Sequence, residues 1–173
     1  MITESVVKQA KNGDKIAFQT LYEEIYIDMY RMAYYLLQNR EDAEDAVSEA
    51  VFDMYRGITG LKKWDAYKSW AMKILSVKCK LKMREYSQRQ TESTDDVDVV
   101  SKENVEGQIV LKTDIMKAMT ILSHEEQVIV ICSAVAGMSS DEVSSVTGLK
   151  SATVRTKLSR ALTKLRNRLE AGV

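Results

Sequence analysis

The sequence has no proline, two cysteines and a single histidine among its 173 residues. Cys79 and Cys132 are far apart and form no Cys-x-x-Cys motif, so the sequence predicts neither a disulfide framework nor a metal site. We therefore expect no cofactor and no bound metal. A composition this poor in cysteine suits a reducing compartment, and we expect a cytoplasmic protein.

Motifs of catalysis and of membrane targeting are missing as well. The chain has no Gly-rich phosphate loop and no nucleophile motif. It shows no signal-peptide pattern at its beginning and no apolar run of membrane-spanning length. His124 lies in a Ser-His-Glu-Glu capping sequence, where we expect a solvent-facing residue in the first turn of a helix. The sequence thus predicts a protein that is not an enzyme.

Apolar residues recur at helical spacing, and strand signals are scarce, which predicts an all-α fold. The predicted helices cover residues 15–26, 29–37, 41–56, 66–86, 109–122 and 125–136, with a helix-turn-helix behind them. Around residues 89–108 the pattern gives way to polar and acidic residues, typical of a flexible linker. We expect two small helical domains, 1–88 and 109–173, joined by this acidic linker.

The segment 139–169 predicts a helix-turn-helix. Ser139 and Glu142 form a capping box, Gly148 ends the first helix and Ser151 caps the second. The predicted apolar face of the second helix consists of Val154, Leu158, Ala161, Leu162 and Leu165. The polar face is basic, and no acidic residue occurs between positions 143 and 169. Such a basic helix behind a turn is typical of a recognition helix in a DNA major groove.

Two earlier segments also concentrate charge, although the net charge of the chain is zero. Asp42, Asp45 and Glu49 share one helical face, a pattern typical of a solvated surface that also suits docking on a basic protein. The segment 62–89 mixes cations with aromatic residues, as in proteins that bind unpaired DNA. Within it, Trp70, Ile74, Val77 and Leu81 form an apolar stripe that we expect in the core.

The order of these parts resembles the extracytoplasmic-function group of the sigma-70 family, compact sigma factors with regions 2 and 4 only. The resemblance is carried by Asp42–Val47 with Glu49, by Ser69-Trp70 with Ile74, and by the motifs Gly137–Val143 and Thr153–Arg155 with Arg160. It implies an RNA polymerase sigma factor, monomeric when free, that binds core polymerase and promoter DNA, both double-stranded and melted. It also implies an anti-sigma protein as a partner.

The resemblance further implies roles for individual residues. Asp42, Asp45 and Glu49 would dock on the polymerase clamp. The −10 element would be contacted by Lys62, Lys63, Trp64, Lys73, Lys80 and Arg84. The −35 element would be contacted by Ser151, Thr153, Arg155, Thr156, Lys157, Arg160 and Lys164.

The chain departs from the family pattern at Val77 and Leu81, where the family usually has Asn and Asp, and these departures bear on −10 recognition. Two other readings stay open. One is a stand-alone helix-turn-helix regulator, which predicts a symmetric dimer and palindromic sites. The other is a degenerate sigma factor that binds polymerase or an anti-sigma protein without starting transcription.

Overall fold

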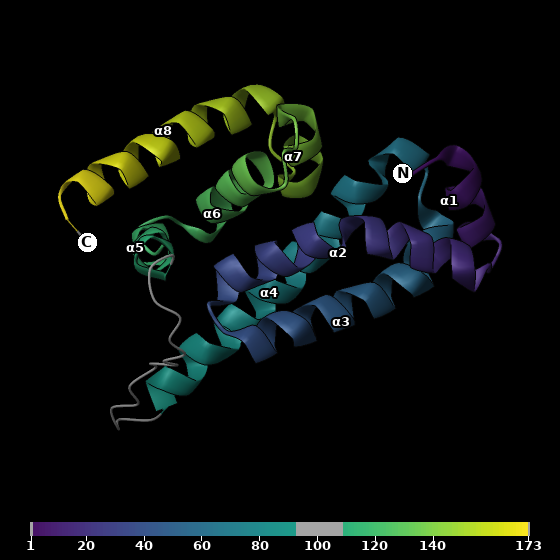
Figure 1. Ribbon diagram of the computed structural model, residues 1–173, viewed down its shortest axis with the longest axis horizontal. Coiled ribbons are helices and arrows are strands. Elements are labelled where there is room, and N and C mark those ends of the chain that lie inside the picture. Colours follow the sequence, from purple (N-terminus) through teal and green to yellow (C-terminus); the bar gives the residue numbers. More distant parts are fainter. Residues whose placement is uncertain (1, 93–108, 173) are drawn as a thin grey trace.

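The computed structural model describes residues 2–92 and 109–172, and the side chains of 2–88 and 114–172. The predicted linker therefore lies outside the described residues, apart from the last turn of one helix. Every regular element in the described ranges is helical (Figure 1). The elements are α1 (Glu4–Lys11), α2 (Lys15–Leu37), α3 (Arg40–Gly57), η1 (Ile58–Gly60), η2 (Trp64–Ala66), α4 (Tyr67–Glu92), α5 (Ile109–Met119), α6 (His124–Val130), η3 (Ile131–Val135), α7 (Ser140–Thr147) and α8 (Ser151–Glu170).

The N-terminal helices differ from expectation in two places. The backbone continues unbroken through 27–28, so α2 is one helix of 23 residues where two were predicted. The physical reason is that no Gly or Pro interrupts it, while buried Ile25, Met29 and Met32 continue its apolar stripe. The predicted cap is confirmed, because the Asp14 carboxylate accepts hydrogen bonds from the amides of Ile16 and Ala17. Helix α1 was not predicted.

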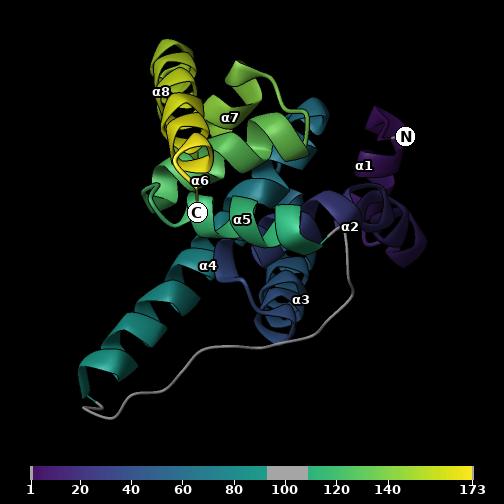
Figure 2. The same cartoon turned by 60° about the vertical axis from the view of Figure 1, so that its left-hand side comes forward.

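Helix α4 forms one wall of the N-terminal bundle, packed against α2 and α3. Its first turn inserts Tyr67, and Leu75 and Cys79 follow on the same buried side. The C-terminal half of α4 projects beyond the rest of the bundle (Figure 2). The expectation that Val77 and Leu81 belong to the core was wrong, since their side chains are 52% and 47% exposed.

The C-terminal helices confirm both capping boxes, Ser123 with Glu126 and Ser139 with Glu142. Gly148 ends α7 in the left-handed conformation with φ +78°, as predicted. Two expectations were wrong. Ser151 is the first residue of α8 and not its cap, and Leu162 is exposed because it lies beyond the edge of the stripe that packs on α6 and α7.

The two groups of helices lie against each other, with α5–α8 stacked on the layer of α2 and α4 (Figure 1). Lys68 of α4 connects them. Its ammonium group pairs with the Asp28 carboxylate of α2 at 2.7 Å and donates to the carbonyl of Ala136, just after η3, at 2.9 Å. The Gln38 side chain donates to the carbonyl of Met116 in α5. In addition, one continuous cluster of buried apolar residues includes members of both groups.

None of the helices in the described ranges is both long and apolar enough to cross a membrane.

Candidate nucleic-acid interface

Helix α8 presents the predicted −35 residues along most of its length, but they do not share one environment. Arg155, Thr156 and Arg160 are exposed, whereas Thr153 and Lys157 are half-buried. Within the described residues, neither arginine has an ion-pair partner. The Thr156 hydroxyl donates to the carbonyl of Ala152, four residues earlier. The freely presented cations of α8 are therefore its arginines.

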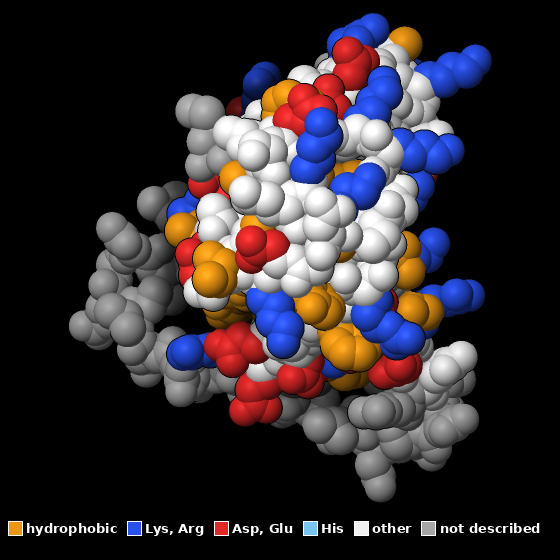
Figure 3. Space-filling view, turned by 90° about the vertical axis from the view of Figure 1, so that its right-hand side faces the viewer, with side chains coloured by type: hydrophobic (Ala, Val, Ile, Leu, Met, Phe, Trp, Pro, Cys, Tyr) orange, Lys and Arg blue, Asp and Glu red, His pale blue; other side chains and the backbone are white. Residues whose placement is uncertain are grey.

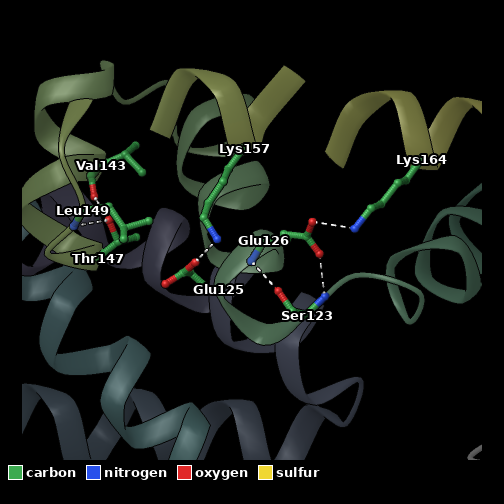
Figure 4. A network of polar contacts seen from close by, with 8 residues as sticks. All are labelled: Ser123, Glu125, Glu126, Val143, Thr147, Leu149, Lys157 and Lys164. Carbon is green, nitrogen blue, oxygen red and sulfur yellow. Dashed lines mark hydrogen bonds and ion pairs between the residues drawn. The ribbon is translucent and has the colours of Figure 1, made fainter. Parts of the chain in front are cut away.

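Two lysines of α8 are turned toward α6 instead (Figure 4). The Lys157 ammonium pairs with the Glu125 carboxylate at 2.6 Å, and Lys164 pairs with Glu126 at 2.7 Å. The bond from Lys164, followed by the bond from the Ser123 amide, lowers the pKa of Glu126. These contacts brace the second helix of the helix-turn-helix against α6, so Lys157 and Lys164 have structural partners that the sequence analysis missed.

Ser151 and His124 also differ from expectation. The Ser151 hydroxyl contacts the Asp141 carboxylate in α7 and so ties the start of α8 to the preceding helix. His124, expected to face solvent, is half-buried, and neither ring nitrogen has a hydrogen-bond partner among the described residues. Burial, and secondarily the charge of Lys80, lowers the pKa of His124.

Helix α4 divides its cations between two faces. Lys78 pairs with Asp53 at 2.7 Å and Glu49 at 3.7 Å, and Lys82 lies 3.6–3.9 Å from Asp45 and Asp42. The hydrogen bond to Asp53 raises the pKa of Lys78. On the outer face lie three exposed cations without an ion-pair partner in the described part of the chain. They are Lys73, Lys80 and Arg84, all predicted −10 residues.

The predicted docking carboxylates lie on α3 and differ in exposure. Asp42 is only 22% exposed and is engaged by Lys82 and by the Tyr86 hydroxyl. Asp45 and Glu49 are more open, with Asp45 72% exposed. We define these three residues as the docking stripe. The local spacing predicted their common face, but it carried no signal for the lysines of α4 that border it.

The remaining −10 candidates precede α4. Lys62 and Lys63 are exposed in the segment between η1 and η2, and exposed Trp64 begins η2. A shallow hollow joins this segment to Trp70 and Lys73, and Ser145 of α7 forms part of its lining. The C-terminal helices thus border the predicted −10 surface. On the side of α1, Lys and Arg side chains line one edge and Asp and Glu gather near the lower end (Figure 3).

The chain matches two known protein-family models, which identify the family that carries these surfaces. Residues 21–89 match the family model described as Sigma-70 region 2, and residues 112–165 match Sigma-70, region 4. The chain belongs to the sigma-70 family of RNA polymerase sigma factors, in its extracytoplasmic-function group. The sequence resemblance to that group is confirmed. The docking stripe and α4 fall in region 2, and α6–α8 fall in region 4.

Individual relatives of this sigma factor agree. It is 25% identical over 153 residues to the ECF RNA polymerase sigma factor SigM of Mycobacterium tuberculosis, covering 88% of this chain and 77% of that protein. It is 26% identical over 142 residues to RNA polymerase sigma factor SigV of Bacillus subtilis, covering 82% and 84%.

Solved structures share the fold. CnrH, determined in complex with the cytosolic domain of CnrY, superposes with a TM-score of 0.76 at 20% identity, covering 97% of both chains. RpoE from Bartonella quintana, determined with the anti-sigma factor NepR, gives a TM-score of 0.72 at 20% identity, covering 90% of this chain and 99% of that one.

Proposed function

We propose that this sigma factor directs RNA polymerase to promoters through three surfaces. The docking stripe binds the polymerase clamp, the outer face of α4 with the segment 62–64 contacts the −10 element, and α8 contacts the −35 element. The proposed domain limits are 1–88 for region 2 and 109–173 for region 4. Both regions belong to one chain held on one polymerase. Binding of one region to its promoter element therefore raises the effective concentration of the other region at its own element.

The observation that carries this proposal is the separation of paired from unpaired cations on both helices. Arg155 and Arg160 of α8, like Lys73 and Lys80 of α4, are exposed and lack ion-pair partners in the described residues. Unpaired cations attract the phosphate groups of DNA and displace the counterions bound to the DNA. The paired lysines are already neutralised by carboxylates and are less able to do so. Since both sigma regions are present, a stand-alone regulator or a degenerate sigma factor is not favoured.

The proposal extends to partners and location. CnrH and RpoE were solved with CnrY and with the anti-sigma factor NepR, and a comparable anti-sigma protein is a candidate partner here. In this proposal the free chain is a cytoplasmic monomer without enzymatic activity. Its zero net charge predicts weak DNA binding in the absence of polymerase.

Run-off transcription with purified core polymerase tests the proposal. We expect transcripts from a subset of promoter templates only when this chain is added. Efficient binding to core polymerase without transcripts from any template would support the degenerate interaction module instead. A dimer with high affinity for palindromic DNA, formed without polymerase, would support the stand-alone regulator.

A further inference from the structure

Val77 and Leu81 are apolar residues whose side chains are exposed to solvent, where they add no burial energy to the isolated protein. Their side chains, both on α4, are 52% and 47% exposed. A valine and a leucine at helical spacing are ordinarily buried in the core, but these two are not. Their exposed apolar surface is therefore available to a binding partner.

The neighbours of these residues indicate an anionic partner. Positions 73, 77, 80, 81 and 84 share one side of the helix, because 77 and 81 follow 73 at intervals of four, and 80 and 84 lie three residues after 77 and 81. Three of the five are the exposed cations Lys73, Lys80 and Arg84, and Val77 lies between them. No acidic residue occurs in α4 before Glu85. The face is therefore a short apolar centre inside a positive border.

The inner cations of α4 sharpen this contrast. Lys68, Lys78 and Lys82 each pair with carboxylates of α2 or α3. Among the described side chains of this helix, charge is thus sorted by face, with ion-paired cations inside and unpaired cations outside. A docking face for an apolar protein helix would not need unpaired cations on its border, whereas a DNA face needs them to reach phosphates.

DNA offers one apolar group that such a centre can recognise. The C5 methyl of thymine projects into the major groove, which is wide enough for an α-helix, and apolar side chains contact it. From Lys73 to Arg84 the face is roughly 16 Å long at 1.5 Å per residue, a length that fits within the groove. Asn or Asp at these positions would instead offer hydrogen-bonding groups.

We propose that Val77 and Leu81 are specificity-determining residues that contact thymine methyl groups in the duplex part of the −10 region. This inference rests on the proposed function, because it requires α4 to meet promoter DNA. In the free chain the C-terminal helices border this face at two places: the charge of Lys80 acts on His124 of α6, and Ser145 of α7 lies with Trp70 and Lys73 around one hollow. Val77 and Leu81 lie one to two turns beyond it.

Deoxyuridine tests the methyl contact directly, because it differs from thymidine only by that methyl group. Promoter duplexes carrying deoxyuridine at single positions of the −10 region are bound by polymerase reconstituted with the full chain. We expect a loss of about fourfold in affinity at one or two positions, the value of one buried methyl. With Val77→Ala or Leu81→Ala, unmodified promoter binding falls by a similar factor and the deoxyuridine penalty at the matching position disappears.

Ile16→Ala is the matched control, because Ile16 is an exposed apolar residue (77%) that belongs to α2 and not to α4. It should change neither promoter affinity nor the deoxyuridine penalty. Equal binding of thymidine and deoxyuridine duplexes by the unaltered chain would overturn the inference while leaving the proposed function intact. A penalty that persists in Val77→Ala with Leu81→Ala would overturn it too, as would a loss confined to core polymerase binding. Failure to start transcription on any template would instead remove the proposed function.

Discussion

The two basic helices, α4 of region 2 and α8 of region 4, distribute their cations in the same way, but their outer faces differ in the side chains that lie between the cations. Each has inner lysines paired with carboxylates of neighbouring helices and outer cations without such partners in the described residues. On α4 the outer cations border Val77 and Leu81, whereas on α8 Arg155 and Arg160 lie among the hydroxyls of Thr156 and its neighbours.

The partners of the inner lysines differ too. In region 4, Glu125 and Glu126 belong to α6 and only support the helix-turn-helix. In region 2, the lysines of α4 contact the docking stripe itself, so the proposed polymerase contact and the proposed −10 contact lie on opposite sides of one pair of helices. We infer that a change on one region 2 surface affects the other, while α8 can be altered alone.

The largest effect should come from removing the outer cations of α8. Arg155→Ala with Arg160→Ala is expected to weaken binding of the reconstituted polymerase to promoters with a −35 element by about a hundredfold, if each contact contributes 1–3 kcal/mol. The measurement is promoter affinity, together with its dependence on salt. The salt dependence should become shallower, because two phosphate-facing cations are lost.

Lys157→Ala is the matched control for these arginines, since its ammonium group already pairs with Glu125. We expect a loss of stability of about 0.2–1 kcal/mol and little change in promoter affinity. If Lys157→Ala weakened promoter binding as much as Arg160→Ala, the division into inner and outer cations would be wrong for region 4.

Sequence reasoning recovered this helix-turn-helix well because its signals are local. Two capping boxes and the Gly148 turn each depend on residues within four positions of one another, and all three are confirmed. The pairing of Lys157 with Glu125 joins residues 32 positions apart, so no local spacing encodes it. For the same reason, Val77 and Leu81 fit an apolar stripe in sequence, but only the packing of α4 on α2 and α3 determined which side was buried.

Next in size should be the effect of opening the contact between the two halves. Lys68→Ala removes both the ion pair with Asp28 and the bond to the carbonyl of Ala136. Hydrogen bonds to charged groups contribute about 1.5–3 kcal/mol, so the ratio of closed to open chain should fall by roughly ten- to a hundredfold. A larger radius of gyration in small-angle scattering, with unchanged helical content, is the expected result.

Lys78→Ala serves as the control for Lys68, because the partners that Lys78 has among the described residues, Asp53 and Glu49, lie within region 2. It should leave the radius of gyration unchanged. Scattering curves that are identical for the unaltered chain and Lys68→Ala would show that the contacts of Lys68 are not needed to hold the halves together.

A smaller effect, about tenfold, is expected for the docking stripe. Asp45→Arg with Glu49→Arg reverses the charge of its two more exposed members and should weaken binding to core polymerase. Affinity measured in a pull-down or by fluorescence tests this, with circular dichroism to verify that the helices persist. Asp53→Asn, which changes another Lys78 partner outside the stripe, should keep core affinity. Unaltered affinity of the double variant would remove the docking assignment.

The smallest expected effect concerns His124, the only histidine, which α6 holds half-buried without hydrogen-bond partners among the described residues. Burial lowers its pKa in the folded chain below the value of about 6.5 for an unfolded histidine. The unfolded chain therefore takes up a proton first as the pH falls, and stability present above this value is lost below it. Melting temperatures at about pH 7.5 and about pH 5.5 should differ less in His124→Phe than in the unaltered chain. Glu126, whose pKa is also lowered, loses its contribution only in more acidic solution, so an equal difference in both chains would mean that His124 is freely protonated in the folded state.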